Sequence, residues 1–320
     1  MTSTTVVVPT RNRRELLVAT LRSVLSQRDV DLQVIVVDEG SDDGTADAVR
    51  ELDDRRVRLV HHDTAKGLPA ARNAGLAVAI GEWIAFCDDD DLWAPDKLAL
   101  QLDAARRAEA VWSCTGAAEI DPALHIVGWE RCPPTVGTDE LRRRNVVPAG
   151  GSGVLARTDV VRALGGFDEA LRAAEDWDLW LRLAAVGNAA VVDLPLVAYR
   201  VWPGSMSRDL ARMDEAVAVV LARAGQDPSA DGWDREHARY RIKQLLRSGR
   251  RGPAARALLA LATESGSGRV GDVPKAVLAA LAPQWYLRVA ARRSTRAVPD
   301  RWPDVVGAWL DPLRELAPAA

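Results

Sequence analysis

The chain is poor in cysteine and has no long uninterrupted hydrophobic run. Its three cysteines, Cys87, Cys114 and Cys132, lack the spacing of a metal site and leave an odd thiol, which favours a reduced setting. In the N-terminal segment the charges follow a short apolar run, unlike those of a secretory signal peptide. No run approaches the roughly 20 apolar residues that cross a bilayer. We therefore expect a cytoplasmic protein, either free or peripheral at the inner face of the membrane.

Strong net charge and a glycine-rich phosphate loop are also missing. The formal net charge of −3 over 320 residues gives no general attraction to nucleic acid, so no nucleic-acid partner is expected. Residues 9–14, which follow the first predicted strand, contain no glycine. This argues against a dehydrogenase, which would carry a G-x-G-x-x-G motif there, and against a nucleotidyltransferase.

Short apolar runs alternate with helical patterns over the first 115 residues. The runs at 5–8, 32–37, 57–60 and 82–87 predict strands, and the segments between them carry apolar residues at helical spacing. Continuous apolar strands separated by helices predict an α/β, Rossmann-like fold with a mostly parallel central sheet. Further strands are expected at 112–129 and 191–201. After about residue 208 the Ala-, Leu- and Arg-rich composition predicts a helical C-terminal region, residues 209–320.

Acidic side chains follow two of the predicted strands. Asp38 and Glu39 end the second strand, and four consecutive aspartates, residues 88–91, end the fourth. Parallel sheets bind ligands at the carboxyl ends of their strands, so these acids should meet. Adjacent carboxylates repel one another, and a hard divalent cation such as Mg²⁺ or Mn²⁺ relieves that repulsion. The alternative is a solvated acidic turn, favoured by the dipole of the following helix.

Two further groups suit a reaction with a phosphorylated substrate. Arg72 lies in a predicted helix, and its guanidinium has the fork geometry that phosphate prefers. Glu175 and Asp176 precede another helix, where a carboxylate serves either as a general base or as a partner of the helix dipole. Trp177 and neighbouring tryptophans either stack on a sugar or pack in the core.

The ordered set of motifs resembles the inverting family 2 glycosyltransferases of the GT-A fold. It runs from about residue 5 to residue 207 and comprises VVVPTRNR, VIVVDEGSDDGT, KGLPAARNAGLAVAIGEWIAFCDDDDLWAPDKL, GGFDE and EDWDLWLRL. The resemblance implies a catalytic domain at 1–208, with a nucleotide-sugar-binding part at 1–115 and an acceptor-binding part at 116–208.

The same resemblance implies a role for each matching residue. Asp90 matches the metal ligand of the DXD motif, and Asp176 matches the catalytic base. The donor contacts it implies are Thr10, Asp38, Glu39, Arg72, Asp88 and Asp89. UDP- or dTDP-sugars are the favoured donors and a GDP-sugar is the alternative. The acceptor is a glycan, a lipid-linked saccharide or a small natural product.

The sequence departs from the family pattern at two positions. Glu39 stands where a second aspartate is usual, and Trp202 stands where many relatives have a histidine that approaches the metal or the diphosphate. Trp202 cannot ligate a metal, so either the ion has fewer protein ligands or this tryptophan contacts donor or acceptor, as Glu175 and Trp177 would. A Gln-x-x-Arg-Trp-like element of processive synthases is not apparent, which favours transfer of a single sugar.

Two alternatives remain from the sequence alone. The chain either transfers sugar or binds sugar nucleotides without turning them over. Its C-terminal segment 274–293 has apolar residues followed by two arginines. That segment either rests on an anionic membrane surface or packs against the catalytic domain or a second subunit, giving a homodimer.

Overall fold

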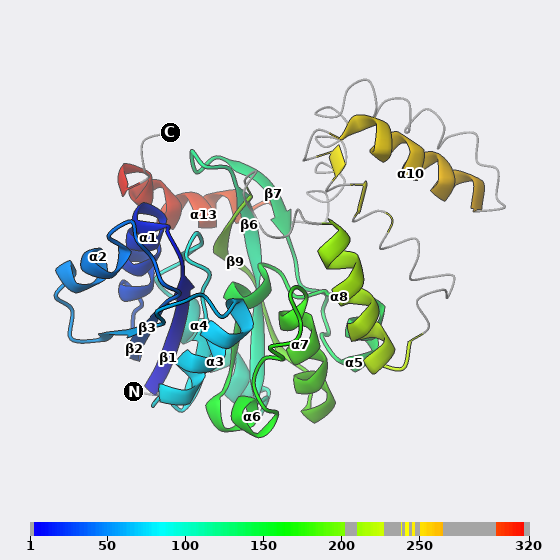
Figure 1. Cartoon of the computed structure of the whole chain (residues 1–320). Helices are drawn as coiled ribbons and strands as arrows, with labels where there is room; N and C mark the ends of the chain where they lie inside the picture. The colour runs from blue at the N-terminus through cyan, green and yellow to red at the C-terminus, as the bar shows by residue number, and fades with distance from the viewer. Residues whose placement is uncertain are drawn as a thin grey trace.

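The first half of the chain forms four parallel strands. The computed structural model describes residues 3–201, 210–226, 238, 241–242, 245–246, 250–264 and 299–316. These strands are β1 (Ser3–Thr10), β2 (Asp31–Asp38), β3 (Val57–His61) and β4 (Trp83–Phe86) (Figure 1). Their order in the sheet is β3-β2-β1-β4. The chain thus leaves β1 towards β2 on one side and reaches β4 on the other. This reversal of strand order places a crevice at the carboxyl ends of β1 and β4.

The second half continues the same sheet with mixed strand directions. Next to β4 come β8 (Val154–Arg157), β6 (Trp112–Ile120), β9 (Ala190–Arg200) and β5 (Leu92–Trp93), and β7 (Ile126–Glu130) pairs with β6. β6 and β9 are parallel, whereas β8 is antiparallel to both of its neighbours. The predicted α/β fold with a central sheet is confirmed, and each antiparallel pair includes β5, β7 or β8.

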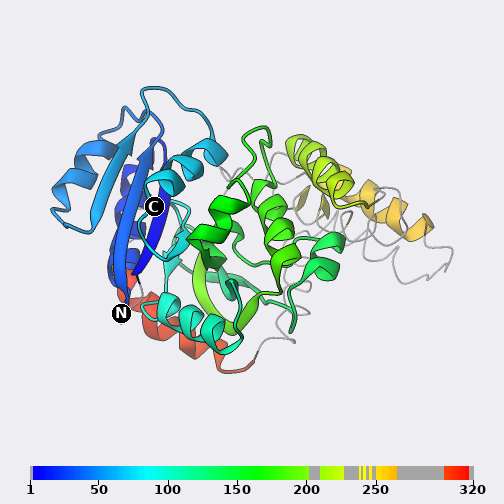
Figure 2. The same cartoon turned by 90° about the horizontal axis from the view of Figure 1, so that it is seen from below.

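Helices cover both faces of the sheet (Figure 2). Because strand side chains alternate, Val7 of β1 faces one apolar layer while Val6 and Val8 face the other. The layer at Val7 includes α3 (Leu68–Val78), α5 (Thr138–Arg143), α6 (Thr158–Ala163) and α7 (Glu175–Val186). The opposite layer includes α1 (Arg14–Leu25), α2 (Thr45–Glu51) and α4 (Lys97–Arg107). Both faces are therefore buried, which explains why the strands are apolar throughout.

The described part of the C-terminal region is helical, as predicted. It contains α8 (Leu210–Arg223), α10 (Arg251–Glu264), α13 (Trp302–Leu310) and the 3-10 helix η3 (Asp311–Leu316). α13 returns to the sheet, where Trp302 is fully buried and packs edge-on against Trp129 with ring centroids 5.8 Å apart. α10 stands away from the sheet in Figure 1. Residues 274–293, proposed from the sequence to contact a membrane or a second subunit, lie outside the described residues.

In the described part of the chain, no helix is both long enough and apolar enough to cross a bilayer.

Candidate functional site

A pocket of about 170 Å³ lies at the switch point between β1 and β4. Its wall combines the ends of both strands with the N-terminal turn of α7 and with α8, which contributes Met213. Five carboxylates and four arginines line it: Asp88, Asp89, Asp90, Glu175, Asp176, Arg13, Arg72, Arg172 and Arg200. Segments about 160 residues apart in the sequence therefore meet in one charged cavity.

Two of the four consecutive aspartates are held by residues at the end of β1 and just after it. Thr10 Oγ1 donates to Asp89 Oδ2 at 2.8 Å, and Arg13 Nη1 donates to Asp89 Oδ1 at 2.8 Å and to Asp90 Oδ2 at 3.0 Å. Burial raises the pKa of Asp89 to about 7 against the lowering effect of Arg13. The sequence patterns assign no role to Arg13. Its position just after the end of a strand is the feature that could have indicated a place in the site.

The fourth aspartate ties the motif to the rest of the sheet. Asp91 is fully buried, and its Oδ1 accepts a hydrogen bond from the backbone N–H of Arg200 in β9 at 3.0 Å. The Arg200 guanidinium donates to the carbonyl of Asp90 at 2.9 Å, while Ser152 Oγ accepts from the N–H of Asp88 at 3.0 Å. Burial raises the pKa of Asp91 well above its usual range. The four aspartates thus differ, and Asp91 has a structural role.

Arg72 joins the acidic motif to the start of α7. Its Nη2 donates to Asp88 Oδ1 at 2.6 Å and its Nη1 donates to Glu175 Oε1 at 2.7 Å. The guanidinium carbon lies 5.2 Å from the centre of the Phe167 ring. Only 2% of the Arg72 side chain is exposed, so the arginine is a fixed bridge between the two walls of the pocket.

Asp176 lies beside this bridge in the first turn of α7. Its Oδ1 accepts from the backbone N–H of Trp177 at 2.6 Å. Burial and the neighbouring charge of Glu175 raise the pKa of Asp176 to about 7, although Arg72 opposes the shift. A carboxylate with that pKa accepts and releases a proton near neutral pH.

Two glycines leave room for these side chains. Gly150 and Gly151 belong to the 3-10 helix η1 (Gly150–Gly153) that precedes β8. A Cβ at Gly151 would lie 2.9 Å from Arg72 Nη2, and one at Gly150 would lie 2.9 Å from Asp176 Oδ2. The turn formed by η1 therefore approaches both functional groups closely.

The acids after β2 are engaged by their own loops. Asp38 is fully buried, accepts from Ser41 and lies 3.0 Å from His61 Nδ1 through Oδ2. Glu39 Oε2 accepts the backbone N–H groups of Lys66 at 2.8 Å and Gly67 at 2.6 Å. Glu39 therefore fixes the loop that precedes α3, the helix that carries Arg72.

The structure places the two tryptophans of the sequence prediction differently. Trp177 is 5% exposed and belongs to the core, where its indole N–H donates to the carbonyl of Leu141 at 2.8 Å. This corrects the expected contact with donor or acceptor, because α7 turns the side chain at 177 away from the pocket. Trp202 lies outside the described residues.

A divalent metal has oxygen donors available but no complete protein cage. Within the described ranges, no three His, Cys, Asp or Glu side chains are grouped to hold an ion. Asp90 offers a carboxylate at the pocket wall, with its side chain 12% exposed and Arg13 on one oxygen. This donor set fits a hard cation that takes its remaining ligands from substrate and water.

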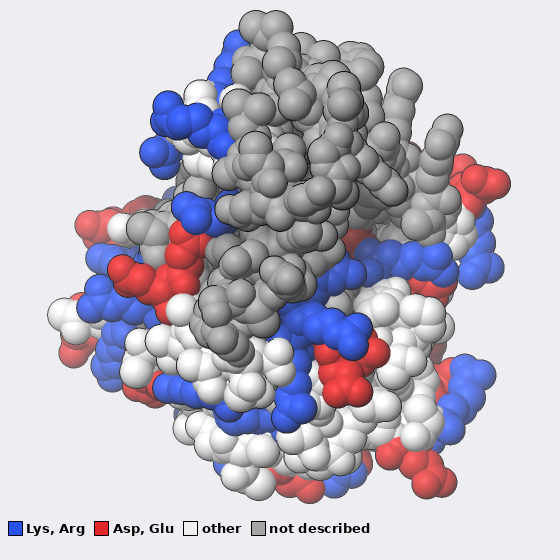
Figure 3. Space-filling model, turned by 90° about the vertical axis from the view of Figure 1, so that its right-hand side faces the viewer, with Lys and Arg blue, Asp and Glu red and all other residues white. Residues whose placement is uncertain are grey.

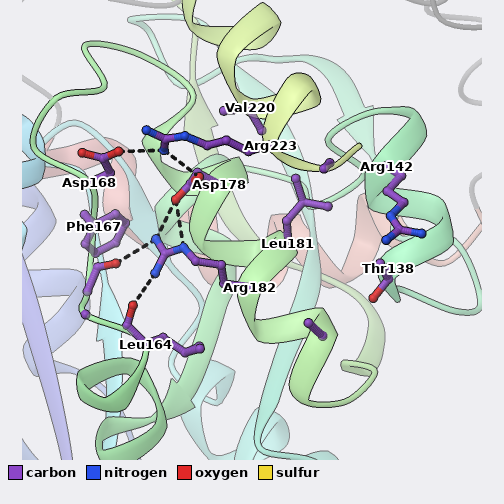
Figure 4. A pocket seen from close by; sticks show the side chains of 14 residues that line it. Thr138, Arg142, Leu164, Phe167, Asp168, Asp178, Leu181, Arg182, Val220 and Arg223 are labelled. Carbon is purple, nitrogen blue, oxygen red and sulfur yellow. Dashed lines mark hydrogen bonds and ion pairs between the residues drawn. The ribbon is translucent and has the colours of Figure 1, made fainter. Parts of the chain in front are cut away.

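The first turn of α7 is supported from behind by an ion-pair network, shown in Figure 4. Arg223 of α8 pairs with Asp168 at 2.6 Å and with Asp178 at 3.2 Å, and Arg182 pairs with Asp178 at 2.7 Å. The guanidinium of Arg182 also donates to the carbonyls of Leu164 and Gly166. α8 is thereby attached to the loop that carries Phe167, the ring against Arg72.

The described part of one face of the molecule carries charges of both signs. Figure 3 shows that Lys and Arg side chains lie among Asp and Glu side chains on the described part of one face.

Comparison with known proteins places this chain among the glycosyltransferases. Residues 5–162 match the family model "Glycosyl transferase family 2". The succinoglycan biosynthesis protein ExoO of Rhizobium meliloti is 34% identical over 68% of this chain and 66% of its own length. The Escherichia coli protein WfaP, a UDP-Glc:α-D-GlcNAc-diphosphoundecaprenol β-1,3-glucosyltransferase, is 28% identical over 68% of this chain and 87% of its own. The chain belongs to glycosyl transferase family 2.

Solved structures share the fold. Staphylococcus aureus TarS in complex with UDP-GlcNAc superposes with a TM-score of 0.57 at 17% identity, over 98% of this chain and 90% of that one. The mannosyltransferase PcManGT of Pyrobaculum calidifontis, solved with GDP-Man and Mn²⁺, gives 0.56 at 23% identity over 91% and 86%. The resemblance to GT-A family 2 enzymes inferred from the motifs is confirmed, and the protein is a glycosyltransferase that uses nucleotide sugars.

Proposed function

We propose that the protein transfers a single sugar from a nucleoside diphosphate sugar to an acceptor hydroxyl with inversion at the anomeric carbon. One observation carries the proposal. Arg72 links Asp88 of the acidic motif to Glu175, the neighbour of Asp176, within one pocket. A carboxylate suited to remove an acceptor proton is thereby held next to the acids expected at the donor diphosphate.

The proposed reaction is a single displacement. Asp176 accepts the proton of the acceptor hydroxyl while that oxygen attacks the anomeric carbon, and the nucleoside diphosphate leaves from the opposite face. The transition state has oxocarbenium character, as in other glycosyl chemistry. The side chain of Asp176 has a pKa of about 7, which allows it to act as a base near neutral pH.

The donor site is assigned to the strand ends of residues 1–115. Thr10, Asp88 and Asp89 line or support the crevice where ribose and diphosphate would lie, and Arg72 would contribute positive charge. A carboxylate such as Asp38 can accept the N–H of uracil or thymine, and UDP- or dTDP-sugars are the donors that we favour, with a GDP-sugar as the alternative. To do so Asp38 must exchange its contact with His61 for the base, whereas Glu39 acts through the loop it holds.

A divalent cation, Mn²⁺ or Mg²⁺, is part of the proposal because PcManGT was solved with Mn²⁺. Asp90 would hold it together with oxygens of the donor. When bound, the ion would neutralise charge on the departing diphosphate.

The acceptor side is assigned to residues 116–208, and a lipid-linked saccharide is the favoured acceptor. The acceptor in the name of WfaP is a sugar on diphosphoundecaprenol. With such an acceptor the protein would work in the cytoplasm at the inner face of the membrane.

The test is the variant Asp176→Asn. We expect transfer to fall by at least about 10²-fold, while the thermal shift produced by the preferred nucleotide sugar with Mn²⁺ stays unchanged. Asp139→Asn, which changes an exposed acid of α5 in the same way, should keep wild-type turnover. Transfer that survives in Asp176→Asn within a few-fold would remove Asp176 from the role of base. Analysis of the product by NMR gives its anomeric configuration, and retention would overturn the inverting mechanism.

A further inference from the structure

Arg172 differs from the other arginines that line the pocket. Arg13 and Arg72 are paired with carboxylates, and Arg200 donates to the carbonyls of Asp90 and Pro122. Arg172 is exposed and has no hydrogen-bond or ion-pair partner in the described part of the chain. The guanidinium of Arg172 therefore forms no ion pair within the described part of the chain and stays available to a ligand.

The backbone around Arg172 is held firmly. Leu171 is 5% exposed and packs in the core, and its N–H donates to the carbonyl of Asp168 at 3.1 Å. On the other side Ala174 is buried and adopts a left-handed conformation with φ 54° just before α7. Arg172 thus starts from a fixed position four residues before Asp176.

The surroundings of Arg172 point to the acceptor and not to the donor. Arg13 and the aspartates belong to the strand ends assigned to the nucleotide sugar, and Arg72 of α3 is bonded to Asp88 and Glu175. Arg172 belongs to the segment that leads into α7, and apolar side chains of Leu68, Ala173 and Met213 line the same pocket. An unmatched guanidinium near apolar groups suits a phosphate ester attached to a hydrocarbon chain.

We propose that Arg172 is a specificity residue that binds a phosphate group of the acceptor close to the hydroxyl that Asp176 deprotonates. This inference rests on the proposed function and narrows its acceptor to a phosphorylated one. A neutral glycan or a neutral small molecule would leave the guanidinium of Arg172 without an anionic partner.

The binding test uses geranyl diphosphate as a probe, with UDP and Mn²⁺ saturating the donor site. We expect the probe to stabilise the wild-type protein, and its Kd to rise about tenfold in Arg172→Ala but only slightly in Arg172→Lys. Arg143→Ala, which removes an exposed arginine that lines none of the described pockets, should bind like wild type. Equal Kd values for Arg172→Ala and wild type would overturn the proposal.

Inorganic pyrophosphate separates an acceptor headgroup from a free anion. We expect it to bind at least several-fold more weakly than geranyl diphosphate. Equal affinity that depends on Arg172 would assign the residue to a free anion and overturn the acceptor role.

The kinetic test compares one sugar presented as an alkyl diphosphate with the same sugar as a neutral alkyl glycoside. Wild type should favour the diphosphate at least tenfold in kcat/KM, and Arg172→Ala should lose most of that preference with an unchanged KM for the donor. A raised donor KM with the preference intact would place Arg172 at the donor and refute the inference.

Failure of the proposed function looks different: neither hydrolysis nor transfer of any nucleotide sugar would occur in wild type.

Discussion

The two walls of the pocket are built in different ways. The wall at β1 and β4 consists of side chains at or just after the ends of parallel strands. Asp89 and Asp90 have partners at the same sheet edge, namely Thr10 and Arg13. The wall at α7 depends on contacts from behind, through Phe167, the 164–168 loop and Arg223 of α8. The first wall is fixed by the sheet, and the second is fixed by packing between helices.

This difference matters for a transferase. The nucleoside diphosphate part is common to many donors, so a site built on strand ends can stay the same while the acceptor wall varies. Arg72 is the residue that belongs to both walls.

Arg72→Met should have the largest effect because it removes the bridge and leaves Asp88 and Glu175 without their shared cation. Breaking a buried ion pair costs about 3–5 kcal/mol of stability, so chemical denaturation should show a clear loss. Donor binding and transfer should both disappear. Arg72→Lys keeps the charge but cannot span both carboxylates, and it should recover stability more than activity. Donor affinity that survives in both variants would show that the two walls are independent.

Asp90→Asn should disable the donor wall without unfolding it. Removing one group that stabilises developing charge costs about 10²- to 10³-fold in turnover. We expect a loss of that size, together with a higher requirement for Mn²⁺ in a titration. The melting temperature should hardly change, because Asp90 is partly exposed and keeps its neighbours. Asp42→Asn, at an exposed acid after β2, is the matched control and should behave as wild type. Metal dependence that persists unchanged in Asp90→Asn would argue for other ligands.

The same division explains how far the sequence alone could lead. The parallel strands, the acids at their ends and Arg72 carry local patterns, namely apolar runs followed by polar turns. The structure places Arg72 and the aspartates after β4 in one pocket, whereas Asp38 and Glu39 do not line that pocket. The resemblance implies that Glu39 contacts the donor. In the structure its carboxylate accepts the backbone N–H groups of residues 66 and 67, because a glutamate, one methylene longer than an aspartate, reaches this neighbouring loop. No local pattern distinguishes the two roles.

In the second half the local patterns were weaker. β5 has two residues and β8 has four, and α5 and α6 have six each, so their periodicity is too short to detect. The partners of Arg13 and Arg200 depend on strand order, which only the tertiary structure fixes. Trp177 was ambiguous because an aromatic residue in the first turn of a helix suits both a binding site and a core. The boundaries at 115 and 208 stay predictions, and the first of them falls within β6.

The pH dependence of transfer tests the wall at α7 directly. Asp176 has a pKa raised to about 7, so below that pH it is increasingly protonated and cannot accept a proton. We expect kcat/KM to rise with pH through about 7 and then level off, being about tenfold lower at pH 6 than on the plateau. The residual activity of Asp176→Asn should lack this limb. A limb of the same midpoint in that variant would assign it to another group, with Asp89 the first to examine.

The weakest effect is expected where α8 meets α7. Arg223 is about half exposed, so its pairs with Asp168 and Asp178 contribute no more than about 1 kcal/mol. Arg223→Gln should therefore lower the melting temperature only slightly. Its kinetic effect should nevertheless be selective: a few-fold higher KM for the acceptor and an unchanged KM for the donor, because α8 supplies Met213 to the pocket wall.

Arg157→Gln is the matched comparison, since Arg157 is also a partly exposed arginine paired with two acids, Glu82 and Asp159, but lies outside the pocket. It should cost similar stability and leave both KM values alone. An equal rise in both KM values for Arg223→Gln would mean that the helix packing behind α7 supports the donor wall as well, through Phe167 and Arg72.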